Sequence, residues 1–450
     1  MQKLKLIRQI LAAGVFLAFI LMFARFDTFG NLAGLPGSLQ LGPALLQHAG
    51  WAAAAFSIGI ILFTMIAGRV YCSILCPLGL LQDLVLRIKR LFARVSYRPM
   101  PALGKLHFGL AGLLIGAGFA GFMLPLAIFE PFAVAGRIFT ALFQPLTTMI
   151  FKFAGSFAGS GVNWLGQAAI KPSALQNTIL VAATALLLAF ICLKWGRVYC
   201  NSICPVGAIL RLAAGRSLLK VSLDREKCVS CGLCANICKA GCIDTKDKSV
   251  DNSRCVACFN CLDTCRFEAL TYQGASKTEP AFSAGRRNFA AGMAAAAAGY
   301  LVPGALLAKE SAPNSILPPG AGNHERFYST CISCHLCVTA CPSSVIRPSS
   351  PEQSLLSLQQ PSLNFDLGMC EQNCNLCSQV CPVMAIKPVT PEDKKLLKIG
   401  EVVYKKHLCV VVTNQTDCGA CAEHCPTQAV RMIPYQNNLM NLCFNLFKAN

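Results

Sequence analysis

Long apolar runs alternate with short basic segments along most of the chain. Four runs lie in the first half and a fifth follows a pair of arginines: Gln9–Ala24, Trp51–Gly68, Leu106–Phe129, Pro172–Leu193 and Asn288–Ala308. A helix of about 20 apolar residues is long enough to cross a hydrocarbon core of about 30 Å. The pattern therefore predicts a membrane protein with about five transmembrane helices.

The basic residues predict which side of the membrane each connection faces. Residues 69–105 and 194–287 are rich in Lys and Arg, as is the N-terminus, whereas residues 25–50 and 130–171 carry few charges. Cytoplasmic connections carry the excess of Lys and Arg. We therefore expect a bacterial inner-membrane protein with its N-terminus and residues 194–287 in the cytoplasm and residues 310–450 in the periplasm.

The outer connection, Pro131–Ile170, is apolar but interrupted by Gly, Pro and two basic residues. This predicts either helices that lie flat or re-enter at the interface, or an extra hairpin of spans. Glu130, just before it, is the only acid between Asp83 and Asp224. A partly desolvated carboxylate there could accept protons from a quinol. The alternative is an ordinary interfacial acid.

Composition supports a membrane protein and argues against a nucleic-acid partner. The chain is 54% hydrophobic and 14% charged, with a mean hydropathy of +0.51, whereas about a quarter of a soluble domain is charged. Residues 1–309 hold 30 Lys and Arg against 11 Asp and Glu, and residues 310–450 hold ten of each. The net charge of +19 therefore follows the membrane-bearing part and indicates topology and contact with lipid headgroups.

Two regular cysteine runs are the strongest chemical signal among the 27 cysteines. Each reads C-x2-C-x2-C-x3-C, in which three thiolates bind one [4Fe–4S] cluster and the fourth binds the neighbouring cluster. The predicted sets are Cys228, Cys231, Cys234 and Cys265, and Cys255, Cys258, Cys261 and Cys238. The alternative is zinc, which prefers two cysteine pairs per ion. We expect the nearby Cys242 to be a packing residue.

Twelve further cysteines with ligand-type spacing follow the fifth run in three groups: Cys331, Cys334, Cys337 and Cys341; Cys370, Cys374, Cys377 and Cys381; Cys409, Cys418, Cys421 and Cys425. Twelve thiolates suffice for three [4Fe–4S] clusters, although the spacing leaves open which cluster each fourth cysteine joins. Cys331-Ile-Ser-Cys334-His335 also fits c-type haem attachment, and disulfides are possible outside the cytoplasm. Because the same residues continue into a ferredoxin run, we expect clusters and no covalent haem.

The segment Arg286-Arg287-Asn288-Phe289 precedes the fifth apolar run and fits the twin-arginine export pattern. Iron–sulfur clusters are built in the cytoplasm, so an outer domain that holds them must cross the membrane folded. We therefore predict an internal export signal that is retained as an anchor. Two arginines before an apolar helix would also be ordinary cytoplasmic flanking residues.

A third constellation is a repeat, since G-R-V-Y-C-x3-C-P-x-G occurs at Gly68–Gly79 and at Gly196–Gly207. Cysteines four apart lie on one face of a helical turn, so the two copies can present four thiolates to one point. We predict an iron–sulfur cluster at the inner membrane face, and the alternative is a redox-active thiol pair. Arg69 and Arg197 would offset the thiolate charge or reach the headgroups. The predicted ligands are Cys72, Cys76, Cys200 and Cys204.

On these motifs the chain resembles a pair of known families. Residues 1–270 are similar to NapH-type membrane ferredoxins and to the membrane part of NosR, and residues 285–450 are similar to NapG-type exported ferredoxins. The resemblance implies a quinol dehydrogenase that passes electrons from menaquinol or ubiquinol to a periplasmic reductase. Here the two halves are fused. The outer half has three cysteine groups where NapG-type proteins commonly carry four clusters, and NosR's flavin-binding domain has no counterpart.

The expected architecture is an α-helical membrane protein with two α+β ferredoxin-like domains on opposite faces. We expect a transmembrane domain over 1–215, a cytoplasmic two-cluster domain over 216–280, a membrane anchor over 285–309 and a periplasmic multi-cluster domain over 325–450. Five or six clusters would relay electrons between the quinone pool and a periplasmic reductase or multihaem cytochrome.

The sequence shows no set of residues that would carry electrons across the membrane. No motif bridges a core of about 30 Å, and His48 and His107 are not spaced as a haem-binding pair. We therefore expect a quinone, or a haem-bearing subunit of a larger complex, to complete the path. Two other functions stay open: a subunit of an energy-coupling complex fed by cytoplasmic ferredoxin, and an electron donor for the maturation or regulation of a periplasmic metalloenzyme.

Overall fold

The computed structural model describes residues 2–24, 37, 39–46, 51–92, 97, 104–157, 174–274, 283–300, 315–350, 357–366, 368–400, 405–425, 430–434 and 440–443. The chain forms two compact units, Met1–Leu397 and Lys398–Asn450.

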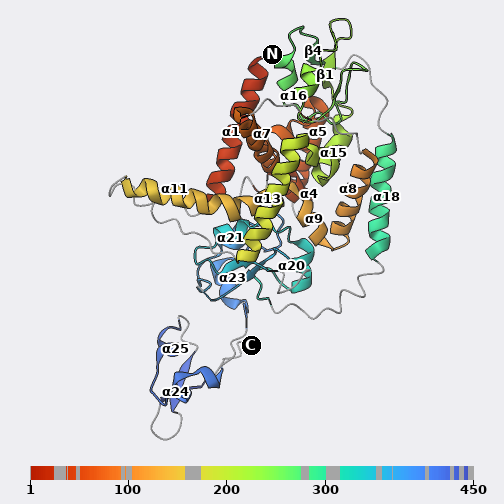
Figure 1. The fold of residues 1–450 in the computed structure, drawn as a ribbon. Coiled ribbons are helices and arrows are strands. Elements are labelled where there is room, and N and C mark those ends of the chain that lie inside the picture. Colours follow the sequence, from red (N-terminus) through yellow and green to blue (C-terminus); the bar gives the residue numbers. More distant parts are fainter. Residues whose placement is uncertain are drawn as a thin grey trace. The chain divides into compact units, whose positions relative to one another are not determined.

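Helices form most of the first unit (Figure 1). In chain order they are α1 (Gln2–Ala24), α4 (Leu41–Leu46), α5 (Trp51–Ala67), α6 (Tyr71–Ile74), α7 (Pro77–Phe92), α8 (Gly104–Phe119), α9 (Met123–Phe129), α10 (Pro131–Ile138), the π-helix η2 (Phe139–Phe143), α11 (Gln144–Phe157), α13 (Leu175–Trp195), α14 (Val198–Ser202), α15 (Pro205–Ala214) and α18 (Ser283–Tyr300). Within the described ranges, three segments are long and apolar enough to cross a membrane: Lys3–Phe23, Pro131–Phe153 and Leu175–Trp195.

The helices α1, α5 and α13 lie where apolar runs predicted them, but the third run is divided. Helix α8 ends at Phe119 and α9 begins at Met123. Gly121 lies between them with φ of +91°, a left-handed conformation that interrupts a helix. In the outer connection α10, η2 and α11 follow one another without a break, and α11 runs crosswise to α1 and α13 (Figure 1).

The fifth predicted span begins in α18, which lies along α8 (Figure 1). Glycines sit at the contact between the two helices. A Cβ on Gly112 would lie 2.2 Å from the Phe289 carbonyl oxygen, and a Cβ on Gly292 would lie 2.3 Å from that of Gly109. Small residues allow such backbone approach between membrane helices. The Arg286 side chain and residues 301–308 lie outside the described part of the chain.

A small α+β unit over residues 219–274, here called the first cysteine module, follows the second repeat. Strand β1 (Leu219–Leu223) pairs antiparallel with β4 (Leu270–Gly274), and β2 (Ile243–Asp244) with β3 (Ser249–Val250). The short helices α16 (Leu233–Ile237) and α17 (Asn260–Thr264) lie between the strands along the chain. The small core of this module includes Val221, Phe259, Leu262 and Leu270.

The second cysteine module covers residues 315–397. It contains α20 (His324–Thr330), α21 (Leu336–Ala340), the antiparallel strands β5 (Ile346–Pro348) and β6 (Pro361–Leu363), α22 (Leu376–Gln379) and α23 (Pro391–Leu396). The unit that begins at Lys398 holds η4 (Lys406–Leu408), α24 (Val410–Thr413), α25 (Ala420–Glu423) and the pair β7 (Arg431–Pro434) and β8 (Met440–Cys443). The predicted periplasmic domain is therefore divided between the two units.

Helix α13 separates the two cysteine modules. Near its start, the Asn177 side chain donates to the Pro348 carbonyl (2.9 Å) and accepts from the Gln359 amide (3.0 Å), both in the second module. Just beyond its end, the Arg197 N–H donates to the Lys239 carbonyl of the first module (2.7 Å). At 1.5 Å per residue these two attachments are about 30 Å apart, which is the thickness of a bilayer's hydrocarbon core.

Candidate functional site

The cysteine runs of both modules share one backbone pattern. In three of them, the second and fourth residues after the first cysteine have positive φ: Ser230 and Gly232, Ala257 and Phe259, Ser333 and His335. The third residue after the last cysteine does so in all four runs: Gly241, Glu268, Ser344 and Met384. Non-glycine residues rarely adopt this conformation. Its regular recurrence indicates loops shaped around the same kind of group.

In the first module the structure brings seven of the eight predicted thiols into two sets that match the spacing. One pocket is lined by Cys238, Cys255, Cys258 and Cys261, together with Cys242. In the other set, burial raises the pKa of Cys234, and the neighbouring Cys265 and Cys231 raise it further. The Cys242 sulfur lies 3.5 Å from that of Cys238, so this thiol lies beside the predicted ligands. The spacing gave no sign of this contact.

In the second module, the fourth cysteine of each run lies with the first three cysteines of the other run. The spacing left this arrangement open. One pocket is lined by Cys331, Cys334, Cys337 and Cys381. Burial raises the pKa of Cys377 to about 12, and the neighbours that add to this rise are Cys370, Cys374 and Cys341. Each run therefore supplies three thiols to its own set and one thiol to the other, as in the first module.

His335 bears on the alternative of a c-type haem. It is buried, and its Nε2 donates to the Gln359 carbonyl at 2.8 Å. Burial also lowers the pKa of this imidazole to about 3. The nitrogen that could bind a haem iron is therefore engaged by the protein, and the arrangement favours a cluster.

The third group of cysteines lies in the second unit. Cys409 precedes α24, Cys421 lies within α25, and Cys418 and Cys425 flank that helix. All four thiols are partly or fully exposed. A cluster at this group stays a prediction.

The two repeats bring their cysteines together at what we call the four-thiol site: Cys72, Cys76, Cys200 and Cys204. Gly68 (φ +73°) and Gly196 (φ +72°) turn the chain back after α5 and α13. The short helices α6 and α14 then carry the first cysteine of each copy. All four cysteines are at most 5% exposed. Burial raises the pKa of Cys204 well above its usual value, and the other three thiols raise it further, so all four lie close together.

Each repeat extends its arginine to the other repeat. Arg69 Nη2 donates to the Cys200 carbonyl (3.0 Å), and Arg197 Nη1 donates to the Cys72 carbonyl (2.6 Å). Both guanidinium groups are fully buried, so neither reaches a lipid headgroup. The glycine that closes each copy is required, because a Cβ at either position would lie 2.3 Å from the same cysteine carbonyls.

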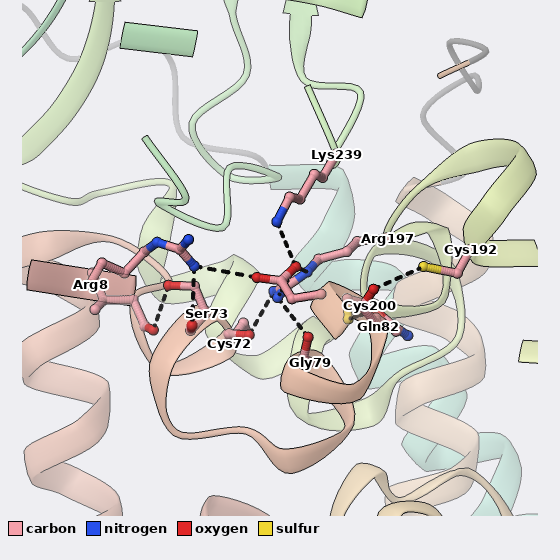
Figure 2. A network of polar contacts seen from close by, with 11 residues as sticks. Arg8, Cys72, Ser73, Gly79, Gln82, Cys192, Arg197, Cys200 and Lys239 are labelled. Carbon is pink, nitrogen blue, oxygen red and sulfur yellow. Dashed lines mark hydrogen bonds and ion pairs between the residues drawn. The ribbon is translucent and has the colours of Figure 1, made fainter. Parts of the chain in front are cut away.

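Asp83 ties the four-thiol site to the first module through Arg197 and Lys239. Figure 2 shows these two side chains and Arg8 pointing toward one another. The Asp83 carboxylate lies 2.7 Å from both Arg197 and Lys239, and 3.3 Å from Arg8. Burial alone would raise the pKa of Asp83, but these three cations outweigh it and hold the pKa well below its usual value. Lys239 directly follows the predicted ligand Cys238. One carboxylate therefore joins α1, the second repeat and the first module.

Buried cations exceed buried acids around the four-thiol site. Arg8, Arg69, Arg197 and Lys239 are each at most 3% exposed, and Asp83 is the one acid that pairs with them among the described residues. Arg69 Nη2 lies 3.8 Å from the Cys72 sulfur. Because uncompensated buried charge is costly, this excess fits a group of net negative charge, such as a [4Fe–4S] cluster with its thiolates.

Across the described ranges, no three His, Cys, Asp or Glu side chains are close enough together to hold a single metal ion.

Glu130 lies at the corner between α9 and α10 and is 1% exposed. Its Oε2 accepts from the Ala133 N–H and caps α10. Its Oε1 has no partner among the described residues, and a Cβ on Gly42 would lie 2.0 Å from it. Glu130 is therefore an enclosed capping residue, and its role as a proton acceptor stays a prediction.

Some charged residues of these sites were not predicted from the sequence as site residues. Asp83 is the single acid in the basic connection 69–105, and Lys239 stands where a proline follows Cys341 and Cys381. Lys394 is a third example. It is buried and donates to the carbonyls of Glu371 and Cys374 beside the second set of the second module. A buried lysine thus accompanies one cysteine set in each module.

Four family models of 4Fe-4S domains match parts of the chain. A 4Fe-4S binding domain matches residues 49–94 and 176–223, which include both repeats, and another matches residues 221–244. Models described as 4Fe-4S dicluster domains match residues 251–345 and 330–385. No solved structure matches the chain significantly.

Three of the relatives are ferredoxin-type proteins of low identity. The methylamine utilization ferredoxin-type protein MauN of Paracoccus denitrificans is 28% identical over 202 residues, 43% of this chain and 59% of that protein. MauN of Methylorubrum extorquens is 25% identical over 254 residues, 52% of this chain and 73% of that protein. The ferredoxin-type protein NapH of Haemophilus influenzae is 24% identical over 182 residues, 40% of this chain and 50% of that protein. The matches thus span about half to three quarters of these relatives' lengths, and the chain carries several 4Fe-4S binding domains and is similar to ferredoxin-type proteins.

Proposed function

We propose that the chain is a membrane-anchored polyferredoxin that relays electrons between the quinone pool and a periplasmic redox partner. In this proposal it is the electron-transfer subunit of a respiratory complex of the quinol dehydrogenase type. The observation that carries the proposal is the placement of two cysteine modules at opposite ends of α13, with the four-thiol site beside the end nearer the first module.

The distribution of charge supports the proposed orientation of the chain in the membrane. If α13 crosses the membrane, its two ends face different compartments, and the basic segments around the first module place that end in the cytoplasm. The second module then lies in the periplasm. The twin arginines at the start of α18 supply the export signal that a folded, cluster-bearing domain needs.

The residues of the chain have three roles in this function. The thiolates hold the clusters, which when bound supply one-electron chemistry. Burial keeps water away from the four-thiol site, whose cysteines are at most 5% exposed. The buried cations Arg69, Arg197 and Lys239 favour a reduced, more negative site and so raise its reduction potential.

The proposed donor is menaquinol or ubiquinol, and the proposed acceptor is a periplasmic reductase or multihaem cytochrome. Glu130 could hold a proton released by the quinol, because a carboxyl group with an unpaired buried oxygen favours the protonated form. In this proposal the NapH-like and NapG-like halves, which are separate proteins in the families that the chain resembles, act within one chain.

The test is anaerobic reduction of the purified, cluster-loaded chain by a menaquinol analogue, followed by electron paramagnetic resonance. We expect cluster signals to appear, and to decrease in a Cys258→Ser variant. Clusters that only a low-potential cytoplasmic ferredoxin reduces would contradict the proposal and favour the energy-coupling alternative. Thiol labelling of intact spheroplasts checks the topology: a Leu396→Cys variant, at a side chain of the second module that is 86% exposed, should react from outside.

A further inference from the structure

A close contact joins α10 to the second cysteine module. A Cβ on Gly136 would lie 2.2 Å from the carbonyl oxygen of Cys334, one of the predicted ligands. One turn later, Thr140 Oγ1 lies 3.2 Å from Thr339 Oγ1 in α21. The backbone of α10 therefore lies directly against the first cysteine set of the second module, with no side chain between them at Gly136.

The end of α9, just before α10 begins, contacts the residue that precedes Cys200 of the four-thiol site. Tyr199, which precedes Cys200, donates its hydroxyl to the Phe129 carbonyl at 2.6 Å. In the other repeat Tyr71, which precedes Cys72, hydrogen-bonds to Gln40 and to the Leu41 N–H. This tyrosine pair therefore extends from the four-thiol site toward α9 and α4.

The corner is fixed from both sides. Glu130 caps the start of α10, and Arg137 Nη2 donates back to the carbonyls of Ala127 and Ile128 at the end of α9 (3.0 and 3.2 Å). An acid at the start of one helix and a base at the end of the preceding helix suit both helix dipoles. From Glu130 to Gly136, α10 rises about 9 Å.

On these contacts, and resting on the proposed function, we infer that the α9–α10 corner, Phe129 to Arg137, is the internal connection between the four-thiol site and the first cysteine set of the second module. At its other side the four-thiol site adjoins the first module through Arg197, Asp83 and Lys239. The chain therefore holds a continuous series of cysteine sets from one end of α13 to the other. A transferred electron oxidises one set and reduces the next, and no bond forms or breaks. A partner's haem or a mobile quinone is not required.

The first test uses the full-length, cluster-loaded chain in quinone-free phospholipid vesicles. Ferricyanide is trapped inside and dithionite is added outside, and the loss of ferricyanide absorbance is followed for the chains whose first module faces outward. We expect oxidation of dithionite to be coupled to reduction of ferricyanide with no quinone present, and empty vesicles to give only the leak rate. Activity that appears only after a menaquinone analogue is added would overturn the inference.

This result is separable from a failure of the proposed function. A chain that carries electrons across the vesicle membrane but is not reduced by quinol would keep the internal connection and remove the quinol role. A chain that is reduced by quinol but does not reduce trapped ferricyanide would keep the quinol role and remove the internal connection.

The second test is a matched pair of helix substitutions. Gly136→Ala must displace the Cys334 backbone, because packed interiors transmit such strain, and we expect transfer to slow by roughly tenfold with an unchanged iron content. Gly14→Ala in α1, where a Cβ meets nothing within 4 Å, should match the unmodified chain in both respects. Equal transfer rates in the two variants would overturn the inference. A loss of iron in Gly136→Ala would leave the decision to the vesicle assay of the unmodified chain.

Discussion

The two repeats use nearly the same residues, but the helices that continue from them, α7 and α15, differ in charge at one corresponding position. Asp83 lies seven residues after Cys76, and the corresponding residue of the second copy, seven after Cys204, is Arg211. Asp83 is buried among three cations. Arg211 instead stands 3.9 Å from Asp251, whose side chain is 41% exposed.

This difference separates two functions within the repeat. The shared residues build a symmetric frame, in which each arginine donates to a cysteine carbonyl of the other copy. The residue that differs ties this frame to α1 and to Lys239 of the first module. Changes to the shared residues should therefore affect both copies alike, and changes at the differing position should not.

The largest expected effect comes from the thiols themselves. Cys76→Ser and Cys204→Ser should each remove the cluster of the four-thiol site, about four irons per chain, because the site takes two thiols from each copy. Iron content per purified chain measures this. Cys192→Ser changes a buried thiol whose neighbour is the Gln82 carbonyl and serves as the control. Loss of iron from one copy's variant alone would contradict a shared site.

The next effect is on stability and is confined to the first copy. Asp83→Asn leaves three buried cations without an acid and should lower the free energy of unfolding by about 3–5 kcal/mol. Asp251→Asn, beside Arg211, should cost less than about 1 kcal/mol because the pair is partly exposed. Thermal unfolding in detergent compares the two, and equal losses would contradict the asymmetry.

The same substitution predicts a pH dependence. The folded pKa of Asp83 is held below the usual value by its cations, so the carboxylate stabilises the fold at pH values above about 4. That stabilisation is lost as the pH falls through the folded pKa. The difference in unfolding temperature between the unmodified chain and Asp83→Asn should therefore be constant near neutral pH and decrease in acid. A difference that grows in acid would contradict this assignment.

The parts that the sequence predicts are those with a local signature. The cysteine groups follow from spacings of three or four residues, and α1, α5 and α13 follow from uninterrupted apolar runs. The turn at Gly121 was missed because alanine, glycine and phenylalanine around it are as apolar as the helices on either side.

The contacts between distant segments could not be predicted in this way. Gly136 and Cys334 are almost 200 residues apart in the sequence, and no motif links them. Lys239 pairs with Asp83 only in the folded chain, so its role could not be predicted from its position in the sequence. The crossed fourth cysteines of the second module also required tertiary structure, because the spacing of Cys370 and Cys374 departs from the regular run.

A smaller effect is expected at Arg69, whose counterpart in the second repeat is Arg197. Arg69→Gln removes a positive charge 3.8 Å from the Cys72 sulfur and should lower the reduction potential of this site by on the order of 100 mV, because the added electron loses a favourable neighbour. Arg69→Lys keeps the charge and should shift the potential less. Redox titration followed by electron paramagnetic resonance measures both. Equal potentials for the Gln and Lys variants would show that the charge of Arg69 does not tune the site.

The smallest expected effect distinguishes the two tyrosines. Among the described residues, the Tyr71 hydroxyl has two partners, the Gln40 side chain and the Leu41 N–H, whereas the Tyr199 hydroxyl has one, the Phe129 carbonyl. At about 1 kcal/mol per hydrogen bond, Tyr71→Phe should lower the unfolding free energy about twice as much as Tyr199→Phe, with iron content unchanged in both.

A reversed order would carry information about the α9–α10 corner. Tyr199 and Phe129 form the contact between the four-thiol site and this corner, whereas Tyr71 connects its repeat to α4. If Tyr199→Phe proved the more damaging variant, the corner would depend on that single hydrogen bond more than bond counting suggests. Its transfer rate in the vesicle assay should then fall as well, because loosening this contact moves the second repeat away from α10.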